Sequence, residues 1–163
     1  MGSGKTIVGK LLSNRIGYRY VDLDNFIELN EKKPIKDIFS SRGEIYFRKI
    51  EHQVFENILK TESNFVLATG GGTPCYYNNH LFLQNLDVTS VYLKTDLDTL
   101  INRLKPEIEH RPLFSQIKTD AQLKEFIAKH LFEREYYYNF SKYKIATHSK
   151  TIDSICEEIL LLL

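Results

Sequence analysis

Apolar residues along this chain fall into two kinds of run, which predict short strands separated by helices. Four stretches are almost continuously apolar, as expected for strands buried on both faces of a parallel sheet. These predicted strands are residues 20–23, 65–68, 88–93 and 143–146. Between them apolar residues recur at helical spacing, which predicts helices at residues 5–16, 25–31, 34–41, 44–60, 97–104, 120–138 and 151–163.

Strands that alternate with helices indicate one α/β domain over residues 1–163, a parallel sheet with helices on both faces. No repeat, linker or low-complexity segment divides the chain. In this architecture ligands bind at the carboxyl ends of the strands. The apolar run at residues 159–163 continues a helical pattern that includes Asp153 and Glu157, so we expect a docked helix there rather than a membrane anchor.

Composition narrows the class of protein. The 163 residues are 42% hydrophobic and 26% charged, and a net charge of +1 gives no overall attraction to nucleic acid or to a membrane. The two cysteines and five histidines have no metal-ligand spacing. Two cysteines and no signal peptide indicate a reducing cytoplasm rather than a disulfide framework. We also expect a monomer that acts on small molecules.

Candidate chemistry begins at the start of the chain. Gly2, Ser3, Gly4, Lys5 and Thr6 match the second half of the nucleotide-binding motif G-x-x-x-x-G-K-[ST]. In that motif the backbone N–H groups surround phosphate oxygens, the lysine reaches the phosphates, and the last hydroxyl binds Mg²⁺. The first glycine of the motif would lie two positions before Met1, so the fragment alone fits a nucleotide site and a simple glycine-rich turn equally well.

Two carboxylates follow the first predicted strand. Asp22 and Asp24 are two residues apart, so in an extended segment both would face one cleft. One would then hold Mg²⁺ through water, and the other would orient or deprotonate an acceptor hydroxyl. The alternative is that Asp24 only caps the helix expected from residue 25. The pair alone leaves both interpretations open.

An arginine–glutamate pair and a run of glycines form the next candidates. Arg48 and Glu51 are three apart on one helix, which suits an arginine that binds a substrate carboxylate. Without further context, an ordinary surface ion pair explains them better. Gly70, Gly71 and Gly72 end a predicted strand, and three glycines together favour close approach of a ligand to backbone N–H groups.

Two more arginines lie in the second half of the chain. Arg111 belongs to a polar segment, residues 105–117, which fits either a lid over a phosphoryl group or a plain surface loop. Arg134 lies among Phe132 and the tyrosines at 136–138. We expect these aromatic residues to be core, and Arg134 alone fits a surface ion pair.

The motifs taken in order are far more specific than any one of them. They are G-S-G-K-T, D-L-D, G-E-I-Y-F-R-K-I-E, T-G-G-G-T, R-P-L-F and E-R-E-Y-Y-Y, and together they strongly resemble the shikimate kinase family from Met1 to Leu163. The resemblance implies transfer of the γ-phosphoryl group of ATP to the 3-hydroxyl of shikimate, in chorismate and aromatic amino-acid biosynthesis. It also implies a three-layer α/β/α fold of the nucleoside-monophosphate-kinase type, with a parallel sheet of strand order 2-3-1-4-5.

The resemblance further implies roles for the residues at matching positions. Lys5, Asp24 and Arg111 would be catalytic, with Asp24 as the base that binds the acceptor hydroxyl. Thr6 and Asp22 would hold Mg²⁺, directly or through water. The residues expected at ATP are Gly2, Ser3, Gly4, Lys5, Thr6, Arg103, Arg111, Thr147 and Lys150. Those expected at shikimate are Asp24, Arg48, Gly70, Gly71, Gly72 and Arg134, walled by Phe39, Phe47 and Pro112, on helices within residues 25–61 and under a lid at 105–117.

Two other functions remain as alternatives. One is a related kinase of the gluconate or nucleoside-monophosphate type, and the other is a nucleotide-binding module that has lost catalysis. The second is motivated by the missing loop glycine. The strand that should feed the loop is also missing from this sequence, and we expect the natural product to begin about ten residues before Met1.

Overall fold

The computed structural model describes residues 2–106, 117 and 119–163. Its strands are β1 (Arg19–Asp22), β2 (Phe65–Ala68), β3 (Val91–Lys94) and β4 (Tyr143–Ala146). Its α-helices are α1 (Lys5–Ile16), α2 (Leu23–Glu31), α3 (Ile35–Thr61), α4 (Leu97–Leu104), α5 (Asp120–Tyr138) and α6 (Ile152–Leu160). All the predicted strands are therefore confirmed. Those at 65–68 and 143–146 keep their predicted boundaries, and the boundaries of the other two differ by one to three residues.

Two local features were not expected. The helices predicted at 34–41 and 44–60 form the single element α3, with a kink at Gly43, whose φ of 79° is outside the helical range. Two short 3₁₀ helices, Thr73–Cys75 and Asn79–Gln84, follow the glycine run. Both lie between β2 and β3, where no apolar periodicity in the sequence predicts a helix.

The strands pair in parallel, two by two. β1 pairs with β2 from Arg19↔Phe65 to Asp22↔Ala68, and β3 pairs with β4 from Val91↔Tyr143 to Lys94↔Ala146. Within the described part of the chain, β2 and β3 do not pair with each other. In the family order 2-3-1-4-5, β1 and β2 correspond to strands 2 and 3, and β3 and β4 correspond to strands 4 and 5. The observed pairs are therefore the expected neighbours, and the place expected for strand 1 lies between β2 and β3.

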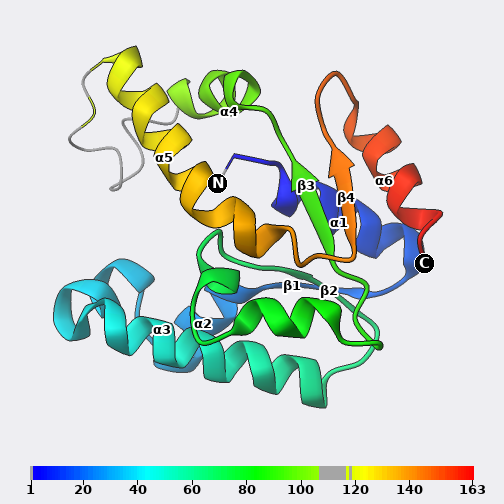
Figure 1. Ribbon diagram of the computed structural model, residues 1–163. Coiled ribbons are helices and arrows are strands. Elements are labelled where there is room, and N and C mark those ends of the chain that lie inside the picture. Colours follow the sequence, from blue (N-terminus) through cyan, green and yellow to red (C-terminus); the bar gives the residue numbers. More distant parts are fainter. Residues whose placement is uncertain (1, 107–116, 118) are drawn as a thin grey trace.

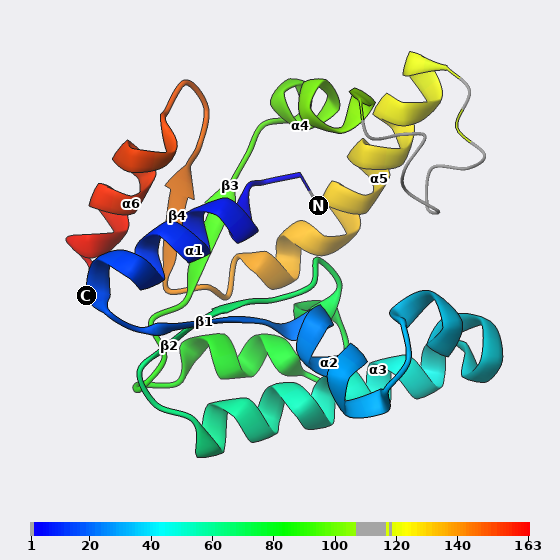
Figure 2. The same cartoon turned by 180° about the vertical axis from the view of Figure 1, so that it is seen from behind.

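Helices cover both sides of the strands (Figures 1 and 2). The core of the first half joins β1 and α2 to α3, with Leu23, Ile27 and Ile58 fully buried. The second half packs α1 and α6 against β3 and β4, through residues such as Val8, Leu93 and Ile155. A third cluster joins α4 to α5. None of the described helices is long and apolar enough to cross a membrane.

The aromatic residues of α5 are divided between core and surface. Tyr138 contacts Tyr92 of β3, with ring centroids 5.0 Å apart. Phe132 and Tyr136 are instead 85% and 65% exposed. The expectation that this aromatic group is core is therefore wrong for Phe132 and Tyr136, because they occupy the outer face of the helix.

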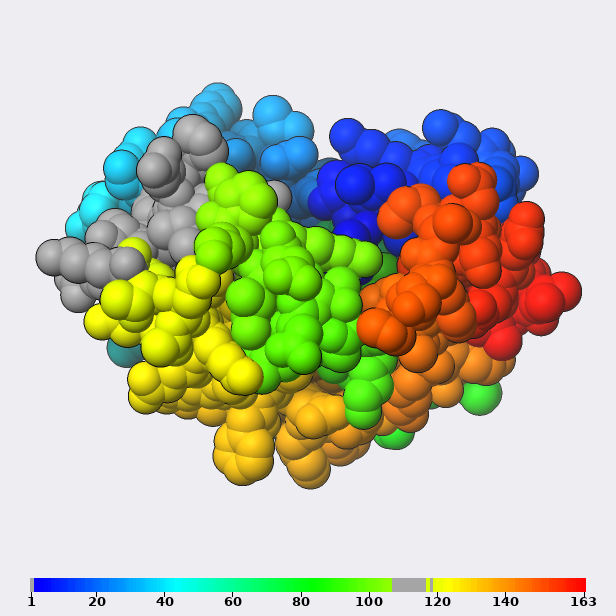
Figure 3. All heavy atoms as spheres, turned by 90° about the horizontal axis from the view of Figure 1, so that it is seen from above, coloured from blue at the N-terminus to red at the C-terminus, as the bar shows by residue number. Residues whose placement is uncertain are grey.

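The carboxyl ends of all the strands lie near the N-terminal loop. Seen from above, the blue N-terminal residues sit between α4 and the turn before α6 (Figure 3). β2 continues into the glycine run, and β3 continues into α4, whose Arg103 reaches the loop. This arrangement brings together residues from opposite ends of the sequence.

Gly9 of α1 provides a test of how tightly α1 packs on β1. A Cβ on Gly9 would lie 2.8 Å from Cε2 of Tyr20, so the ring would have to move. We expect Gly9→Ala to lower the free energy of unfolding by about 1–2 kcal/mol, because overpacking costs about 1–3 kcal/mol and outweighs a gain in helix propensity of about 1 kcal/mol. Urea denaturation would measure it. Asn14→Ala, at an exposed position of the same helix, is the control, and equal stabilisation by both variants would contradict the close contact.

Candidate active site

The N-terminal loop has the backbone of a phosphate-binding loop at its helix end. Gly2 and Gly4 have φ values of 69° and 90°, which a residue with a side chain rarely adopts, and α1 begins directly after Gly4. The N-terminal end of α1 therefore points its free N–H groups and positive dipole end at this loop. From α4, Nη1 of Arg103 donates a hydrogen bond to the Gly2 carbonyl at 3.3 Å. Arg103 thus lies beside the loop.

Asp22 ends β1 and caps α2. Its Oδ1 accepts the N–H groups of Asp24 and Asn25 at 3.1 and 3.4 Å, and its Oδ2 accepts the hydroxyl of Tyr20 at 3.2 Å. The alternative in which Asp24 caps the helix is therefore wrong, because the helix begins two residues earlier than expected. The geometric reason given for the pair is also wrong, since Asp24 lies in the first turn of α2 and not in an extended segment.

Asp24 is freed by this cap to face the cleft. Burial, followed by the neighbouring charges of Asp22 and Glu51, raises the pKa of its carboxyl to about 6, while Lys5 and Arg48 oppose the shift. A carboxyl with this pKa is mostly ionised at neutral pH yet binds a proton far better than an ordinary aspartate. Its environment is typical of an acid–base group.

Arg48 and Glu51 form a buried ion pair. Nη1 of Arg48 lies 2.8 Å from Oε2 of Glu51, whose side chain is 1% exposed. The hydroxyl of Thr73 donates to Oε1 of Glu51 at 2.6 Å. The interpretation as an ordinary surface pair is therefore wrong. A charge this deep is stable only when paired and hydrogen-bonded on both oxygens, and Arg48 and Thr73 meet that requirement.

The glycine run packs directly on these charged groups. A Cβ on Gly72 would lie 2.8 Å from Nη2 of Arg48, so only glycine lets the guanidinium lie against this backbone. A Cβ on Gly70 would lie 3.1 Å from Oδ1 of Asp24 and 3.3 Å from Oε1 of Glu51. The run is therefore the wall that Asp24, Glu51 and Arg48 share, and a side chain at Gly72 would displace the Arg48 guanidinium.

Helix α5 joins this wall through its last turn. The hydroxyl of Tyr138 donates to the Gly71 carbonyl at 2.6 Å. Arg134, one turn earlier on α5, affects the pKa of both Tyr138 and Cys75, and Arg48 also acts on Cys75. The two arginines therefore approach the glycine run from opposite elements, with the thiol of Cys75 near both.

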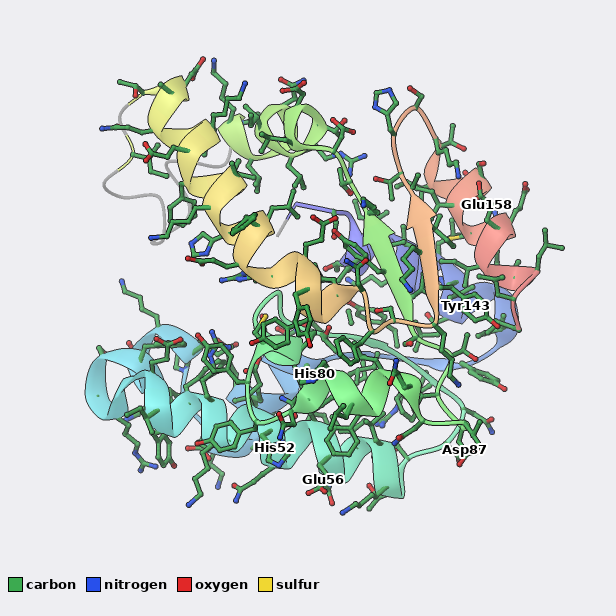
Figure 4. The ribbon with its side chains drawn as sticks, viewed as in Figure 1. His52, Glu56, His80, Asp87, Tyr143 and Glu158 are labelled. Atoms are coloured by element: carbon green, nitrogen blue, oxygen red, sulfur yellow. The ribbon has the colours of Figure 1, made fainter. Side chains whose placement is uncertain are left out.

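The region around the 3₁₀ helices holds the wall in place (Figure 4). The side-chain amide of Asn79, which is fully buried, donates to the Thr73 carbonyl at 2.9 Å, and its oxygen lies 2.7 Å from Nδ1 of His52 on α3. Thr73, Asn79, Tyr138 and Cys75 were missed as site residues. Only the sequence position of Thr73 and Cys75, directly after the glycine run, carried a usable signal.

The residues expected at the adenine end are placed less simply. Thr147 is buried, and its hydroxyl lies 2.7 Å from that of Thr95, so its side chain serves the fold. The Nζ of Lys150 pairs with Glu158 at 2.6 Å. The backbone of this turn, the exposed side chains of His148 and Ser149 and the exposed side of Lys150 are available to a ligand. Arg111 and Pro112 lie outside the described residues, as does most of the expected lid.

Phe39 and Phe47 lie on either side of the kink in α3. Their ring centroids are 4.5 Å apart, and the Phe47 ring lies 5.2 Å from the Arg48 guanidinium. Tyr76 covers the same guanidinium at 4.2 Å. These aromatic faces fix Arg48 without using all of its donors.

Comparisons with known proteins match this chain over nearly its whole length to a single family. The family model for shikimate kinase matches residues 1–163. The shikimate kinase of Flavobacterium psychrophilum is 48% identical over 159 residues, which cover 98% of this chain and 92% of the relative. A crystal structure of the Bacteroides thetaiotaomicron shikimate kinase matches with a TM-score of 0.89 at 33% identity, covering 100% of this chain and 94% of the other. A shikimate kinase from Acinetobacter baumannii, solved in complex with shikimate, matches with a TM-score of 0.83 at 32% identity, covering 99% and 87%.

The raised pKa of Asp24 has a consequence for stability. The native state binds this proton at a higher pH than the unfolded chain, whose aspartates have a pKa near 3.9. The contribution of this group to stability is therefore fully present below about pH 4 and is lost as the pH rises through about 6. We expect Asp24→Asn to unfold at a higher temperature than the parent at pH 7.5, and the difference to shrink towards pH 4.5. Calorimetry across this pH range would measure it, and a variant less stable than the parent at pH 7.5 would contradict the proposed environment.

Proposed function

The chain belongs to the shikimate kinase family, and we propose that the cleft described above transfers the γ-phosphoryl group of ATP to the 3-hydroxyl of shikimate. The observation that carries the proposal is the meeting of Asp24, Arg48 and the glycine run beside a phosphate-binding loop. A compact carboxylated ring needs an anion clamp at one side and a base at the other. This cleft offers both.

Asp24 acts on the acceptor hydroxyl. Ionised at neutral pH, its carboxylate accepts the hydrogen bond of the hydroxyl and takes the proton as the oxygen bonds to phosphorus. A pKa of about 6 suits this role because the carboxylate is free at pH 7 but is a stronger base than an exposed aspartate. The departing ADP leaves on the opposite side of the transferred group.

Arg48 and Arg134 bind the carboxylate of shikimate. Arg48 is held rigidly by Glu51 and by the ring of Tyr76, so little side-chain entropy is lost when it binds an anion. Arg134 approaches from α5, which Tyr138 ties to the glycine run. The N–H groups of Gly71 and Gly72, with Gly70 giving room to Asp24, complete the contacts to the acceptor.

The N-terminal loop binds ATP. Backbone N–H groups of Gly2, Ser3 and Gly4 and the start of α1 face the phosphates, and Lys5 stabilises the charge that develops during transfer. Arg103 and the turn that carries Thr147 and Lys150 border the nucleotide. Arg111 is proposed as the lid arginine on the family resemblance alone.

Thr6 and Asp22 fit a magnesium site. Both supply oxygen, the donor that Mg²⁺ prefers. The hydroxyl of Tyr20 connects them, because it donates a hydrogen bond to Asp22 and a hydrogen bond with Thr6 opposes the rise in its pKa that burial causes. Thr6 and Asp22 would hold the ion directly or through water, with the Asp22 carboxylate fixed by the hydrogen bonds that both of its oxygens accept. The bound ion would supply charge neutralisation at the phosphates. We also propose that the protein works as a cytoplasmic monomer.

Substrate choice is the first test. We expect ADP release, coupled to a dehydrogenase assay, to require shikimate and to be absent with gluconate or AMP. Turnover with gluconate or AMP alone would reject the proposal in favour of a related kinase. ATP binding without turnover of any of the three would favour a module that has lost catalysis.

Asp24→Asn tests the base. We expect kcat to fall about 10²- to 10⁴-fold, the usual contribution of general acid–base catalysis, while the Kd for ATP changes less than about threefold because the phosphate-binding loop is untouched. Asp37→Asn, at an exposed position of α3, is the control. Near-normal turnover by Asp24→Asn would remove Asp24 from this role.

Arg134→Ala tests the clamp. A hydrogen bond to a charged group contributes about 1.5–3 kcal/mol, so we expect KM for shikimate to rise about 10- to 150-fold with KM for ATP nearly unchanged. Lys129→Ala removes an exposed cation from the same helix and is the matched control. If both variants bind shikimate equally well, Arg134 is not part of the clamp.

A further inference from the structure

Asn79 lies in a buried polar network directly behind the glycine run. Its side chain is fully buried, and its amide nitrogen donates to the Thr73 carbonyl at 2.9 Å. Its backbone N–H donates to the Tyr76 carbonyl at 3.0 Å. Its amide oxygen lies 2.7 Å from Nδ1 of His52 on α3 (Figure 4). These three bonds tie the segment after the glycine run to α3.

The directions of the bonds fix the position of the proton on His52. The Thr73 carbonyl only accepts, so the Asn79 atom that faces it is the amide nitrogen, and the amide oxygen faces His52. That oxygen also only accepts, so Nδ1 of His52 carries a hydrogen and donates it. The imidazole stacks on the ring of Tyr77, with centroids 5.4 Å apart and planes 18° apart. His52 is therefore held as an Nδ1–H donor.

The two residues whose carbonyls Asn79 binds are also the residues that hold Arg48. The hydroxyl of Thr73 donates to Glu51 at 2.6 Å, and the other oxygen of Glu51 pairs with the Arg48 guanidinium at 2.8 Å. The ring of Tyr76 lies 4.2 Å from the same guanidinium. Arg48 is thus fixed at one edge through Glu51 and on one face by Tyr76. Both supports depend on Asn79.

The network closes into a ring, because His52 follows Glu51 directly on α3. It passes from Glu51 to the Thr73 hydroxyl, from the Thr73 carbonyl to Asn79, and from Asn79 back to His52. Glu51, Thr73 and Asn79 are at most 1% exposed, so water does not readily replace a bond that is lost. In such a network each bond supports the others, and the loss of one loosens the rest.

Packing alone is the competing explanation for His52. Besides its stacking on Tyr77, its ring lies 6.2 Å from that of Phe82. The two roles use different parts of the side chain, however. Packing uses the whole ring, whereas the network uses only the Nδ1–H group. A substitution can therefore keep either part and remove the other.

We propose that His52 and Asn79 are positioning residues for Arg48. The inference rests on the proposed function, in which the Arg48 guanidinium binds the carboxylate of shikimate. Neither residue touches the reacting atoms. They set the orientation of the guanidinium through Glu51, and so they govern the binding of shikimate and not the transfer of the phosphoryl group.

His52→Phe and His52→Asn test this role as a pair. Phenylalanine keeps the ring and lacks the donor, whereas asparagine loses the ring and places an amide nitrogen near the position of Nδ1. We expect His52→Phe to raise KM for shikimate about three- to tenfold, within the range for one lost hydrogen bond, with kcat and KM for ATP changing less than about twofold. His52→Asn should restore KM for shikimate to within about twofold of the parent value. Asn79 is left in place, because its removal unpairs two buried groups and endangers folding.

Gln53→Ala, at an exposed position beside His52, is the control and should match the parent. The opposite order, with His52→Asn impaired and His52→Phe close to the parent, shows a packing role and overturns the proposal. Equal KM values for shikimate in all the variants overturn it as well. A rise of KM for ATP as large as that for shikimate indicates general loosening of the fold and also overturns it.

A readout without substrate separates this proposal from the proposed function. Nitrogen-15 NMR at alkaline pH should show the Nδ1–H tautomer at His52. Exchange of the Arg48 Nε proton should be faster in His52→Phe than in the parent and in His52→Asn. A parent that shows these signals and does not phosphorylate shikimate rejects the proposed function alone. An Nε2–H tautomer at His52, or unchanged Arg48 exchange in His52→Phe, overturns the positioning role.

Discussion

Glu51 carries its charge out of reach of water, and it does so because separate partners bind its two oxygens. Arg48 takes one and Thr73 takes the other, at 2.8 and 2.6 Å. Removing one partner of such a buried pair typically costs about 3–5 kcal/mol, so neither partner is free to move. Arg48 and Thr73 lie on different elements, α3 and the 3₁₀ helix after the glycine run. The single carboxylate thus locks the acceptor side of the cleft to its wall.

The chemistry of the cleft depends on this lock. Arg48 presents its guanidinium against Gly72, and the absence of a side chain there makes the contact possible. Asp24 lies across Gly70 from Glu51, and burial together with the charges of Asp22 and Glu51 keeps its proton affinity high. The burial and the neighbouring charges that make Asp24 a stronger base also make its ionised carboxylate destabilising to the folded state. Function and stability are opposed at this residue, as they often are at strained or charged sites.

The sequence indicated the strands, the class of fold and the order of the motifs, because apolar runs and glycine-rich turns are local signals. It could not indicate that Glu51 is buried, because an arginine and a glutamate three residues apart on a helix have the same sequence pattern whether the pair is buried or on the surface. Asp24 remained a candidate cap of α2, because a shift of two residues in the start of a helix leaves the apolar pattern unchanged. Asn79 and Tyr138 act through contacts with residues 6 and 67 positions away, Thr73 and Gly71, and no local pattern reveals such partners.

The claim that Glu51 organises the cleft is tested most directly by the titration of Asp24. Carbon-13 NMR of the Asp24 carboxyl would give its pKa in the parent chain and in Glu51→Gln. Glu56→Gln, a partly exposed position on the same helix whose carboxylate pairs with Lys60, is the control. Loss of the Glu51 charge removes a repulsion and leaves Arg48 uncompensated, and both effects favour the ionised form of Asp24. The account predicts a pKa of about 6 in the parent and in the control, and a lower pKa in Glu51→Gln that stays above the ordinary aspartate value because burial, the largest cause of the shift, remains. An unchanged Asp24 pKa in Glu51→Gln would contradict it.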